Sequence, residues 1–195
     1  LNKALTKKNF FNFTTCIFDT FPLIMLLKIV IAGPKGTGKT MIGNFLAGQS
    51  DKLVVDKYIP TIGVRILEFE MKIGGVNENL NIELWDASGD NAYEGCWRAI
   101  MHETDGVMLV YNPDSPGQDQ QIGDWFEYFV RKNGLKDEQC IVFAHRSDAT
   151  RTERFRPPPL FNKVSASLTT HQSGTDMKSM FENFIKEVFG IKQRN

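Results

Sequence analysis

Apolar and polar residues alternate along this chain in blocks that predict strands and helices. Residues 26–32, 106–111 and 139–144 are short, almost continuously apolar runs, as is typical of strands buried on both faces. Residues 63–71 alternate apolar and polar side chains, and residues 80–85 return after a turn rich in glycine and asparagine. This second pair predicts an antiparallel hairpin.

Amphipathic segments with helical spacing separate the strands. The predicted helices cover residues 39–47, 90–103, 119–132 and 175–189. A short edge strand is predicted at residues 160–165. Strands that alternate with crossover helices imply a three-layer α/β fold, in which a mostly parallel sheet of six strands has one antiparallel strand. Ligands of such sheets bind beyond the carboxyl ends of the strands.

The chain divides into two parts. Residues 25–195 are predicted to form one nucleotide-binding domain, whereas residues 1–24 carry no pattern that assigns them a role. We expect residues 1–24 to be a poorly ordered or non-native extension. A weak targeting segment is the alternative, because lysines and aromatic residues occur there.

The sequence GPKGTGKT lies between the first strand and the first helix and matches the phosphate-loop pattern G-x-x-x-x-G-K-[ST] at every fixed position. Glycines let the backbone amides surround an anion, and the dipole of the following helix adds positive charge. Lys39 is expected to reach the β- and γ-phosphates, and the Thr40 hydroxyl to bind Mg²⁺. The candidate residues of this phosphate loop are Gly33, Pro34, Lys35, Gly36, Thr37, Gly38, Lys39 and Thr40.

A second candidate group follows the strand at residues 80–85. Asp86 can hold Mg²⁺ through water, and Gly89 can offer its amide to a γ-phosphate. Thr61, in the connection before the strand at residues 63–71, could complete the coordination of the ion. We therefore assign Thr40, Thr61 and Asp86 to the metal, and Asp86, Ala87, Ser88, Gly89 and Asp90 to the nucleotide.

Composition argues against several kinds of function. The 195 residues contain 23 basic and 23 acidic side chains, so no long-range attraction to nucleic acid or anionic lipid is expected. The three cysteines are far apart, which argues against a disulfide scaffold or a zinc site. No apolar run has the length of a membrane span, and no cysteine lies near the C-terminus to signal prenylation. We therefore expect neither nucleic-acid binding nor a lipid anchor.

In their order along the chain, GPKGTGKT, PTIG and WDASG resemble the motifs of Ras- and Rab-like small GTPases. The sequences PTIGVRILEFE at residues 60–70 and ELWDASGD at residues 83–90 are similar to those of Rab-like subunits of the intraflagellar transport B complex, and the resemblance covers residues 25–190. It implies that the chain binds GTP or GDP with Mg²⁺, acts in ciliary transport and cilium assembly, and docks onto coiled-coil subunits of that complex. It further implies a location in the cilium or flagellum and in the cytoplasm near the ciliary base. Homo-oligomers are not expected.

The base-binding sequence departs from that family. Small GTPases carry N-K-x-D after the fifth strand, where this chain has His145, Arg146 and Asp148. By resemblance, Asp148 accepts hydrogen bonds from guanine N1 and N2, and Arg146 stacks on the base in place of lysine. His145 is either a brace for this loop or a loop residue with no role in binding. The second base-binding loop is assigned to Ser165 and Ala166, and a preference for guanine with reduced affinity is implied.

Two further departures predict slow or absent hydrolysis, so no catalytic residue is assigned. Asp90 stands where active members carry the glutamine that orients water, and its negative charge would face a γ-phosphate. Lys35 occupies a position where active members need glycine to admit the arginine of a partner. Lys35 either neutralises phosphate charge or points to solvent.

The connection at residues 149–163 is short for the helix that normally precedes the sixth strand, and the three prolines at 157–159 cannot continue a helix. We predict that this helix is lost. Arginines in the connection, at Arg151, Arg154 and Arg156, form either a solvated basic loop or a docking surface for an acidic partner.

Together, these features favour a nucleotide-stabilised binding module, in which bound nucleotide shapes residues 52–63 and 88–100 for a partner. The alternative is an active Rab- or Ras-type switch in vesicle trafficking, which would be expected to carry a prenylated tail and a glutamine after Gly89. A third hypothesis is an ATP-dependent P-loop enzyme, and Asp148 argues against it because its carboxylate suits guanine.

Overall fold

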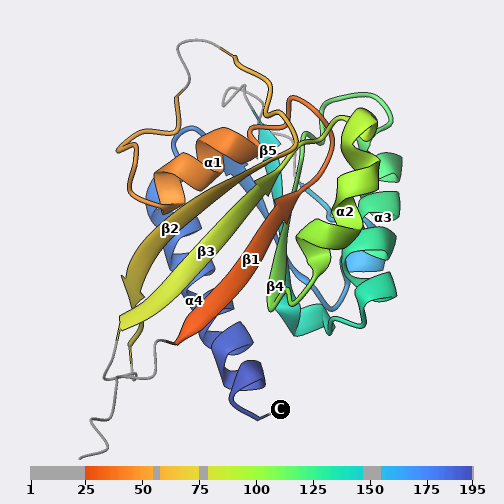
Figure 1. Cartoon of the computed structure of the whole chain (residues 1–195). Helices are drawn as coiled ribbons and strands as arrows, with labels where there is room; N and C mark the ends of the chain where they lie inside the picture. Colours follow the sequence, from red (N-terminus) through yellow and green to blue (C-terminus); the bar gives the residue numbers. More distant parts are fainter. Residues whose placement is uncertain (1–24, 55–57, 75–78, 147–154, 195) are drawn as a thin grey trace, which may run out of the picture.

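The computed structural model describes residues 25–54, 58–74, 79–146 and 155–194, and it contains a six-stranded sheet in the order β2-β3-β1-β4-β5-β6 (Figure 1). β2 and β3 are antiparallel, and the other neighbouring strands are parallel. This confirms the predicted α/β fold with one antiparallel strand. The strands are β1 (Leu26–Ala32), β2 (Val64–Lys72), β3 (Asn79–Ala87), β4 (Gly106–Tyr111), β5 (Cys140–Arg146) and β6 (Ser165–Thr170).

Helices lie on both faces of the sheet, with α1 and α4 on one face and α2 and α3 on the other (Figure 1). Their bounds are α1 (Lys39–Leu46), α2 (Glu94–Met101), α3 (Gln118–Phe129) and α4 (Gly174–Lys192). Single 3-10 turns accompany them at η1 (Asn91–Tyr93), η2 (Arg131–Asn133), η3 (Asp137–Gln139) and η4 (Pro159–Phe161). The predicted helix at 90–103 is thus a 3-10 turn followed by a shorter α-helix.

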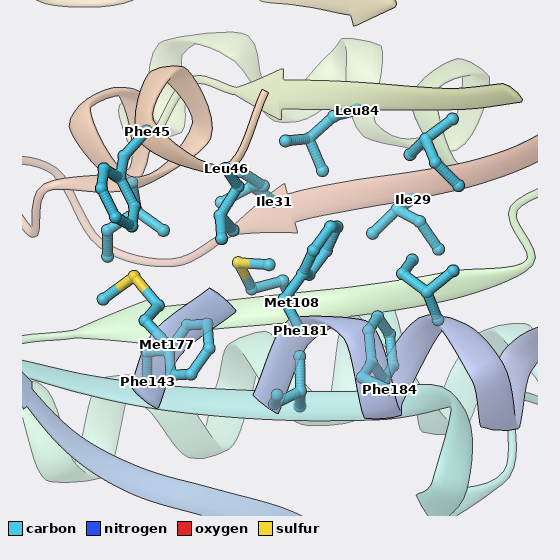
Figure 2. Packing of buried hydrophobic residues seen from close by; sticks show 14 of the residues in the cluster. Ile29, Ile31, Phe45, Leu46, Leu84, Met108, Phe143, Met177, Phe181 and Phe184 are labelled. Atoms are coloured by element: carbon cyan, nitrogen blue, oxygen red, sulfur yellow. The ribbon is translucent and has the colours of Figure 1, made fainter. Parts of the chain in front are cut away.

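Successive residues of a strand point to opposite faces, so β1 contributes to two separate cores. Ile29 and Ile31 pack with α1 and α4, as Figure 2 shows for Phe181 and Phe184 of α4. Val30 and Ala32 belong to the second core with α2 and α3. Five residues of the predicted apolar stripe on the last helix are buried in the first core, which confirms that stripe as core: Met177, Phe181, Phe184, Ile185 and Val188.

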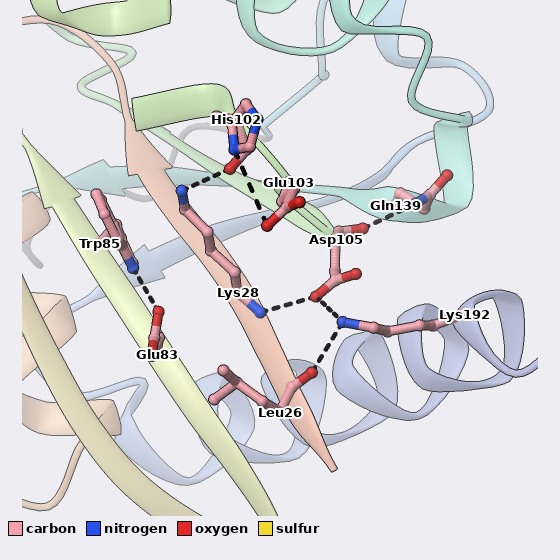
Figure 3. A network of polar contacts seen from close by, with 9 residues as sticks. All are labelled: Leu26, Lys28, Glu83, Trp85, His102, Glu103, Asp105, Gln139 and Lys192. Carbon is pink, nitrogen blue, oxygen red and sulfur yellow. Dashed lines mark hydrogen bonds and ion pairs between the residues drawn. The ribbon is translucent and has the colours of Figure 1, made fainter. Parts of the chain in front are cut away.

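A polar network fastens the start of β1 to the end of α4 (Figure 3). Asp105, just before β4, accepts hydrogen bonds at the same carboxylate oxygen from the Lys28 backbone N–H at 2.9 Å and from Lys192 Nζ at 2.7 Å. Lys28 Nζ donates to the His102 carbonyl at 2.7 Å and lies 3.7 Å from the centre of the Trp85 ring. These contacts fasten the amino ends of β1 and β4, at the end of the sheet opposite the candidate site.

The edge strand predicted at residues 160–165 is wrong. Residues 159–161 form η4, and the strand β6 begins at Ser165 and ends at Thr170. The apolar signal came from Leu160 and Phe161, but Phe161 is buried edge-on against Phe126 of α3 at 5.3 Å between ring centroids. β6 itself consists mostly of serine and threonine, and an edge strand needs little apolar surface to pair with its neighbour.

The helix predicted to be lost before β6 is absent from the described residues 155–164, where only η4 occurs. Residues 1–24 and the arginines Arg151 and Arg154 lie outside the described residues. Among the helices that the structure describes, none combines the length and the hydropathy that a membrane span requires.

Candidate functional site

A cavity of about 850 Å³ opens at the carboxyl ends of the parallel strands. Its walls come from the phosphate loop, from residues between 58 and 65, from residues 88–90 after β3, and from Asn112, His145 and His171 at the ends of β4, β5 and β6. This is the edge of the sheet at which the fold predicts a ligand. The predicted site residues that line it are Lys35, Gly36, Thr37, Gly38, Lys39, Thr40, Thr61, Ser88, Gly89, Asp90 and His145.

The phosphate loop has the backbone conformation that its glycines predict. Gly36 and Gly38 have φ values of 75° and 90°, in the left-handed region that glycine adopts at little cost. At Gly33, a Cβ atom would lie 2.0 Å from the carbonyl oxygen of Val110 in β4, so only glycine fits there. The loop therefore passes close to the sheet before it turns into α1.

Lys39 lies inside this loop and is buried. Its Nζ donates to the carbonyl oxygens of Gly33 at 2.8 Å and Pro34 at 2.6 Å. Burial lowers the Lys39 pKa to about 8, and the Asp86 carboxylate opposes the shift. The two hydrogen-bond acceptors of Lys39 Nζ are neutral carbonyl groups, so they do not balance its charge. An anion bound beside the ammonium would stabilise its charged form.

Thr40, Thr61 and Asp86 meet, as the sequence predicted for a metal site. Thr40 Oγ1 donates to Asp86 Oδ2 at 2.7 Å and lies 2.7 Å from Thr61 Oγ1. Asp86 is fully buried, and within the described part of the chain its Oδ1 has no hydrogen-bond partner. Burial raises the Asp86 pKa, while Thr40, Arg65 and Lys39 oppose the rise. Hydroxyl and carboxylate oxygens are suitable ligands for Mg²⁺, so these residues fit the ion.

In the described ranges, no three histidine, cysteine or acidic side chains lie where they could share a metal ion. Ala87 contributes differently from the prediction, because its side chain is buried in the second core and does not line the cavity.

Arg65 is a site residue that the sequence analysis missed. It stands opposite Asp86 in the pairing of β2 with β3, and its Nη2 lies 3.5 Å from Asp86 Oδ2. The same nitrogen donates to Asn44 Oδ1 of α1 at 2.7 Å. Knowledge of how β2 and β3 pair would have placed Arg65 opposite Asp86, but the sequence alone does not specify which residues of the hairpin pair.

Residues 88–90 close on the phosphate loop. A Cβ atom at Gly89 would lie 2.5 Å from Lys39 Nζ and 2.6 Å from the Gly33 carbonyl oxygen. The next residue, Asp90, forms an ion pair with Lys35 at 3.1 Å, and its other carboxylate oxygen accepts a hydrogen bond from the Ala92 N–H at 3.0 Å. The two departures that predict slow hydrolysis are thus in contact with each other.

His145 forms the opposite wall of the cavity. Its Nδ1 lies 3.1 Å from Thr169 Oγ1 of β6, and in the described structure its buried Nε2 has no hydrogen-bond partner. Burial lowers the His145 pKa to about 4, with a smaller effect from His171, so the ring is neutral at pH 7. A Cβ atom at Gly38 would lie 3.2 Å from His145 Cδ2, which places the ring against the phosphate loop.

The resemblance assigns Arg146 to stacking on the base, and the structure buries its side chain. Its Nε forms an ion pair with Asp114 at 3.1 Å, and its side chain is only 6% exposed. It is not among the residues that line the cavity. Asp148 lies outside the described residues, so its role in binding guanine stays a prediction.

The assignment of Ser165 and Ala166 to the base site is corrected by the strand register. Ser165 pairs with Ile141 and Ala166 with Val142, at the amino end of β5. The cavity lies at the carboxyl end, where Thr170 pairs with Arg146 and His171 follows. His171 therefore lines the cavity in their place, and its Nδ1 hydrogen-bonds to the Leu53 carbonyl.

Comparison with known proteins gives a consistent result. A sequence model of the Ras family matches residues 28–188. The intraflagellar transport protein 22 homolog of Danio rerio is 38% identical over 143 residues, which cover 71% of this chain and 76% of that protein. The Mus musculus homolog is 34% identical over 167 residues, which cover 83% and 89%.

Similarity of fold extends to solved structures. The GTP-bound crystal structure of T. brucei IFT22/74/81 superposes with a TM-score of 0.71 at 23% identity, and the match covers 87% of this chain and 98% of that one. The match of the family model over most of the chain and the identity to the curated relatives lead to one conclusion: the chain belongs to the Ras family and, within it, to the intraflagellar transport protein 22 group.

Proposed function

We propose that this chain binds GTP or GDP with Mg²⁺ and serves as a Rab-like subunit of the intraflagellar transport B complex. Bound nucleotide stabilises its fold, and hydrolysis is slow or absent. The observation that carries the proposal is the buried Lys39 ammonium inside a phosphate loop, next to the cluster of Thr40, Thr61 and Asp86.

The polyphosphate lies along the phosphate loop. The backbone amides of the loop and the N-terminus of α1 bind phosphate oxygens. Lys39 gives up its hydrogen bonds to the Gly33 and Pro34 carbonyls and binds the β- and γ-phosphates instead. Thr40, Thr61 and Asp86 hold Mg²⁺, which neutralises phosphate charge when it is bound. The partnerless Asp86 Oδ1 supports this assignment, because a buried carboxylate oxygen without a partner costs stability until a cation or a donor meets it.

Slow hydrolysis follows from the contacts of Asp90. The Ala92 N–H and the Lys35 ammonium hold the pKa of Asp90 below its usual range, so it is an anion at pH 7. An anion that already binds two donors is poorly placed to orient a water molecule for attack on another anion. The neutral glutamine of active members does not have this repulsion.

The base of the nucleotide lies against the cavity wall that His145 and His171 form. Asp148 gives the preference for guanine by accepting hydrogen bonds from its N1 and N2 groups. In support, His145 lines a cavity that is large enough for a nucleotide, and within the described residues its buried Nε2 has no hydrogen-bond partner.

A partner is proposed to bind the rim of the cavity. Large apolar side chains are exposed there, with Ile59 at 71% and Ile62 at 78%. Exposed apolar clusters of this kind mark interaction sites. The T. brucei IFT22/74/81 structure supports an assembly with further subunits. We therefore infer docking onto coiled-coil subunits of the complex and a location in the cilium and near its base.

Identification of the nucleotide that remains bound after purification tests the binding proposal. We expect GTP or GDP in near-equimolar amount, and release of it on chelation of Mg²⁺. Bound ATP, or no nucleotide together with no binding of added GTP, would contradict it. In a turnover assay with GTP, rapid multiple turnover in the absence of a partner would instead favour the vesicle-trafficking switch.

Partner docking is tested separately by co-purification with the other subunits. Ile59→Asp places a charge in the exposed apolar rim and should abolish co-purification without loss of nucleotide. Leu26→Asp is the matched control, because Leu26 is also exposed but lies at the start of β1, at the opposite end of the sheet. Equal effects of the two variants would reject the rim as the docking surface.

A further inference from the structure

An ion pair bridges two loops at the mouth of the cavity. Lys35 belongs to the phosphate loop, Asp90 follows β3, and their charged atoms lie 3.1 Å apart. Both side chains are partly exposed, at 55% and 40%. Each residue departs from the family pattern in this chain, and the contact indicates that the two departures act together.

The pair lies at the end of the loop where a third phosphate would bind. Gly89 lies beside Lys39 Nζ, the atom that is expected to reach the β- and γ-phosphates. The Cβ position of Gly89 is also 2.6 Å from the backbone nitrogen of Lys35. Lys35 and Asp90 therefore flank the region that a triphosphate fills and a diphosphate leaves empty.

The charges of Lys35 and Asp90 determine how this region interacts with a third phosphate. Asp90 is anchored by the Ala92 N–H at 3.0 Å, so its carboxylate stays near the site when a ligand enters. A carboxylate beside a γ-phosphate repels it, and this repulsion discriminates against the triphosphate. An exposed ion pair contributes little by itself, so the Lys35 ammonium can shift toward a phosphate at small cost. One cation between two anions then removes the repulsion.

We propose that Lys35 offsets the repulsion between Asp90 and a terminal phosphate, so that this site accepts a nucleoside triphosphate although Asp90 lies beside it. Lys35 binds the terminal phosphate while it remains next to Asp90, and Asp90 holds Lys35 in place and penalises the triphosphate whenever Lys35 is absent. The inference rests on the proposed nucleotide binding, and it goes further by assigning acceptance of the third phosphate to the contact between these two residues.

The test compares dissociation constants for GDP and for a non-hydrolysable GTP analogue, in the full chain with Mg²⁺. Lys35→Ala should weaken the analogue about tenfold and GDP less than twofold. Asp90→Asn should strengthen the analogue or leave it unchanged. The double variant should bind the analogue within about threefold of the wild type, because the uncompensated charge is gone. Lys163→Ala, an exposed lysine just before β6, is the matched control and should change neither constant.

Equal weakening of both nucleotides by Lys35→Ala would overturn the proposal, since it would place Lys35 at the diphosphate. Failure of Asp90→Asn to rescue Lys35→Ala would also overturn it, because the two residues would then act independently. A wild-type chain that binds neither nucleotide would refute the proposed function itself, and that outcome is distinct from both of these.

Discussion

At one end of the cavity, Lys39, Thr40 and Asp86 are held by contacts of 2.6–2.8 Å with groups of the phosphate loop and with each other. At the other end, His145 has a buried nitrogen without a partner in the described structure, and Arg146 turns away to Asp114. At the phosphate end, the groups that would bind phosphate and Mg²⁺ are already in contact with one another, and within the described residues only Asp86 Oδ1 among the polar atoms of these three side chains is buried without a partner. The described part of the base end is lined by His145 of β5 and by His171, which follows β6.

This difference indicates where the binding free energy comes from. A triphosphate and Mg²⁺ satisfy charges that are already buried and positioned, so the phosphate end supplies most of the affinity. The base end offers a neutral donor or acceptor and an aromatic edge, whose contributions are smaller. Substitutions at the two ends should therefore change the affinity by different amounts, and only those at the phosphate end should have effects that depend on the number of phosphates.

Lys39→Ala should have the largest effect. It removes the buried ammonium and leaves the phosphate loop with its backbone amides alone, at a cost of about 3 kcal/mol, or more than 100-fold in the dissociation constant for GTP. Isothermal titration measures this directly, and circular dichroism checks the fold. Affinity within a few-fold of the wild type would show that the phosphate loop is not the main binding element.

Gly89→Ala should have the next largest effect. The added Cβ would approach backbone atoms at 2.6 Å, so the loop after β3 must move away from the phosphate loop. We expect roughly 30-fold weaker binding of the triphosphate, on the scale of one lost charge-assisted contact. Gly95→Ala in α2 is the control, because a Cβ there meets no atom within 4 Å, and it should leave binding unchanged.

The affinity for GTP should fall as the pH rises from 7 to 9. The Lys39 pKa is about 8 in the free protein and rises when phosphate binds, so binding takes up a proton above pH 8. The expected loss over this range is about tenfold. Titrations in buffers of different ionisation enthalpy will detect the proton, and a constant affinity from pH 7 to 9 would contradict the shifted pKa.

His145→Ala should have the smallest effect of the four changes. We expect a loss of about 1 kcal/mol, or roughly fivefold, and the loss should be equal for GTP and GDP because both carry the same base. Ser165→Ala is its control and should change nothing, since Ser165 pairs with Ile141 at the far end of β5. A loss that depends on the number of phosphates would remove the distinction between the two ends.

The base end was the part of the site that the sequence predicted least well. The residues of β6 are mostly small and polar, so no apolar alternation marked where this strand begins. The neighbouring Leu160 and Phe161 gave a stronger signal, although Phe161 packs on α3. A shift of the strand by five residues moved the predicted base contacts from the carboxyl end to the amino end of the sheet, because position along a parallel strand decides which end a residue reaches.

The sequence by itself determined the alternation of strands and helices, the phosphate loop, the acid Asp86 near the end of β3 and the glycine Gly89 after it. These features depend on local rules: apolar periodicity, glycine conformation, and a motif whose members are contiguous. Tertiary structure decided the position of Arg65 opposite Asp86, the ion pair of Lys35 with Asp90, and the presence of His171 in place of Ser165. Each of these joins residues that are far apart in the chain, and their distances follow from strand register and loop closure, which no short stretch of sequence encodes.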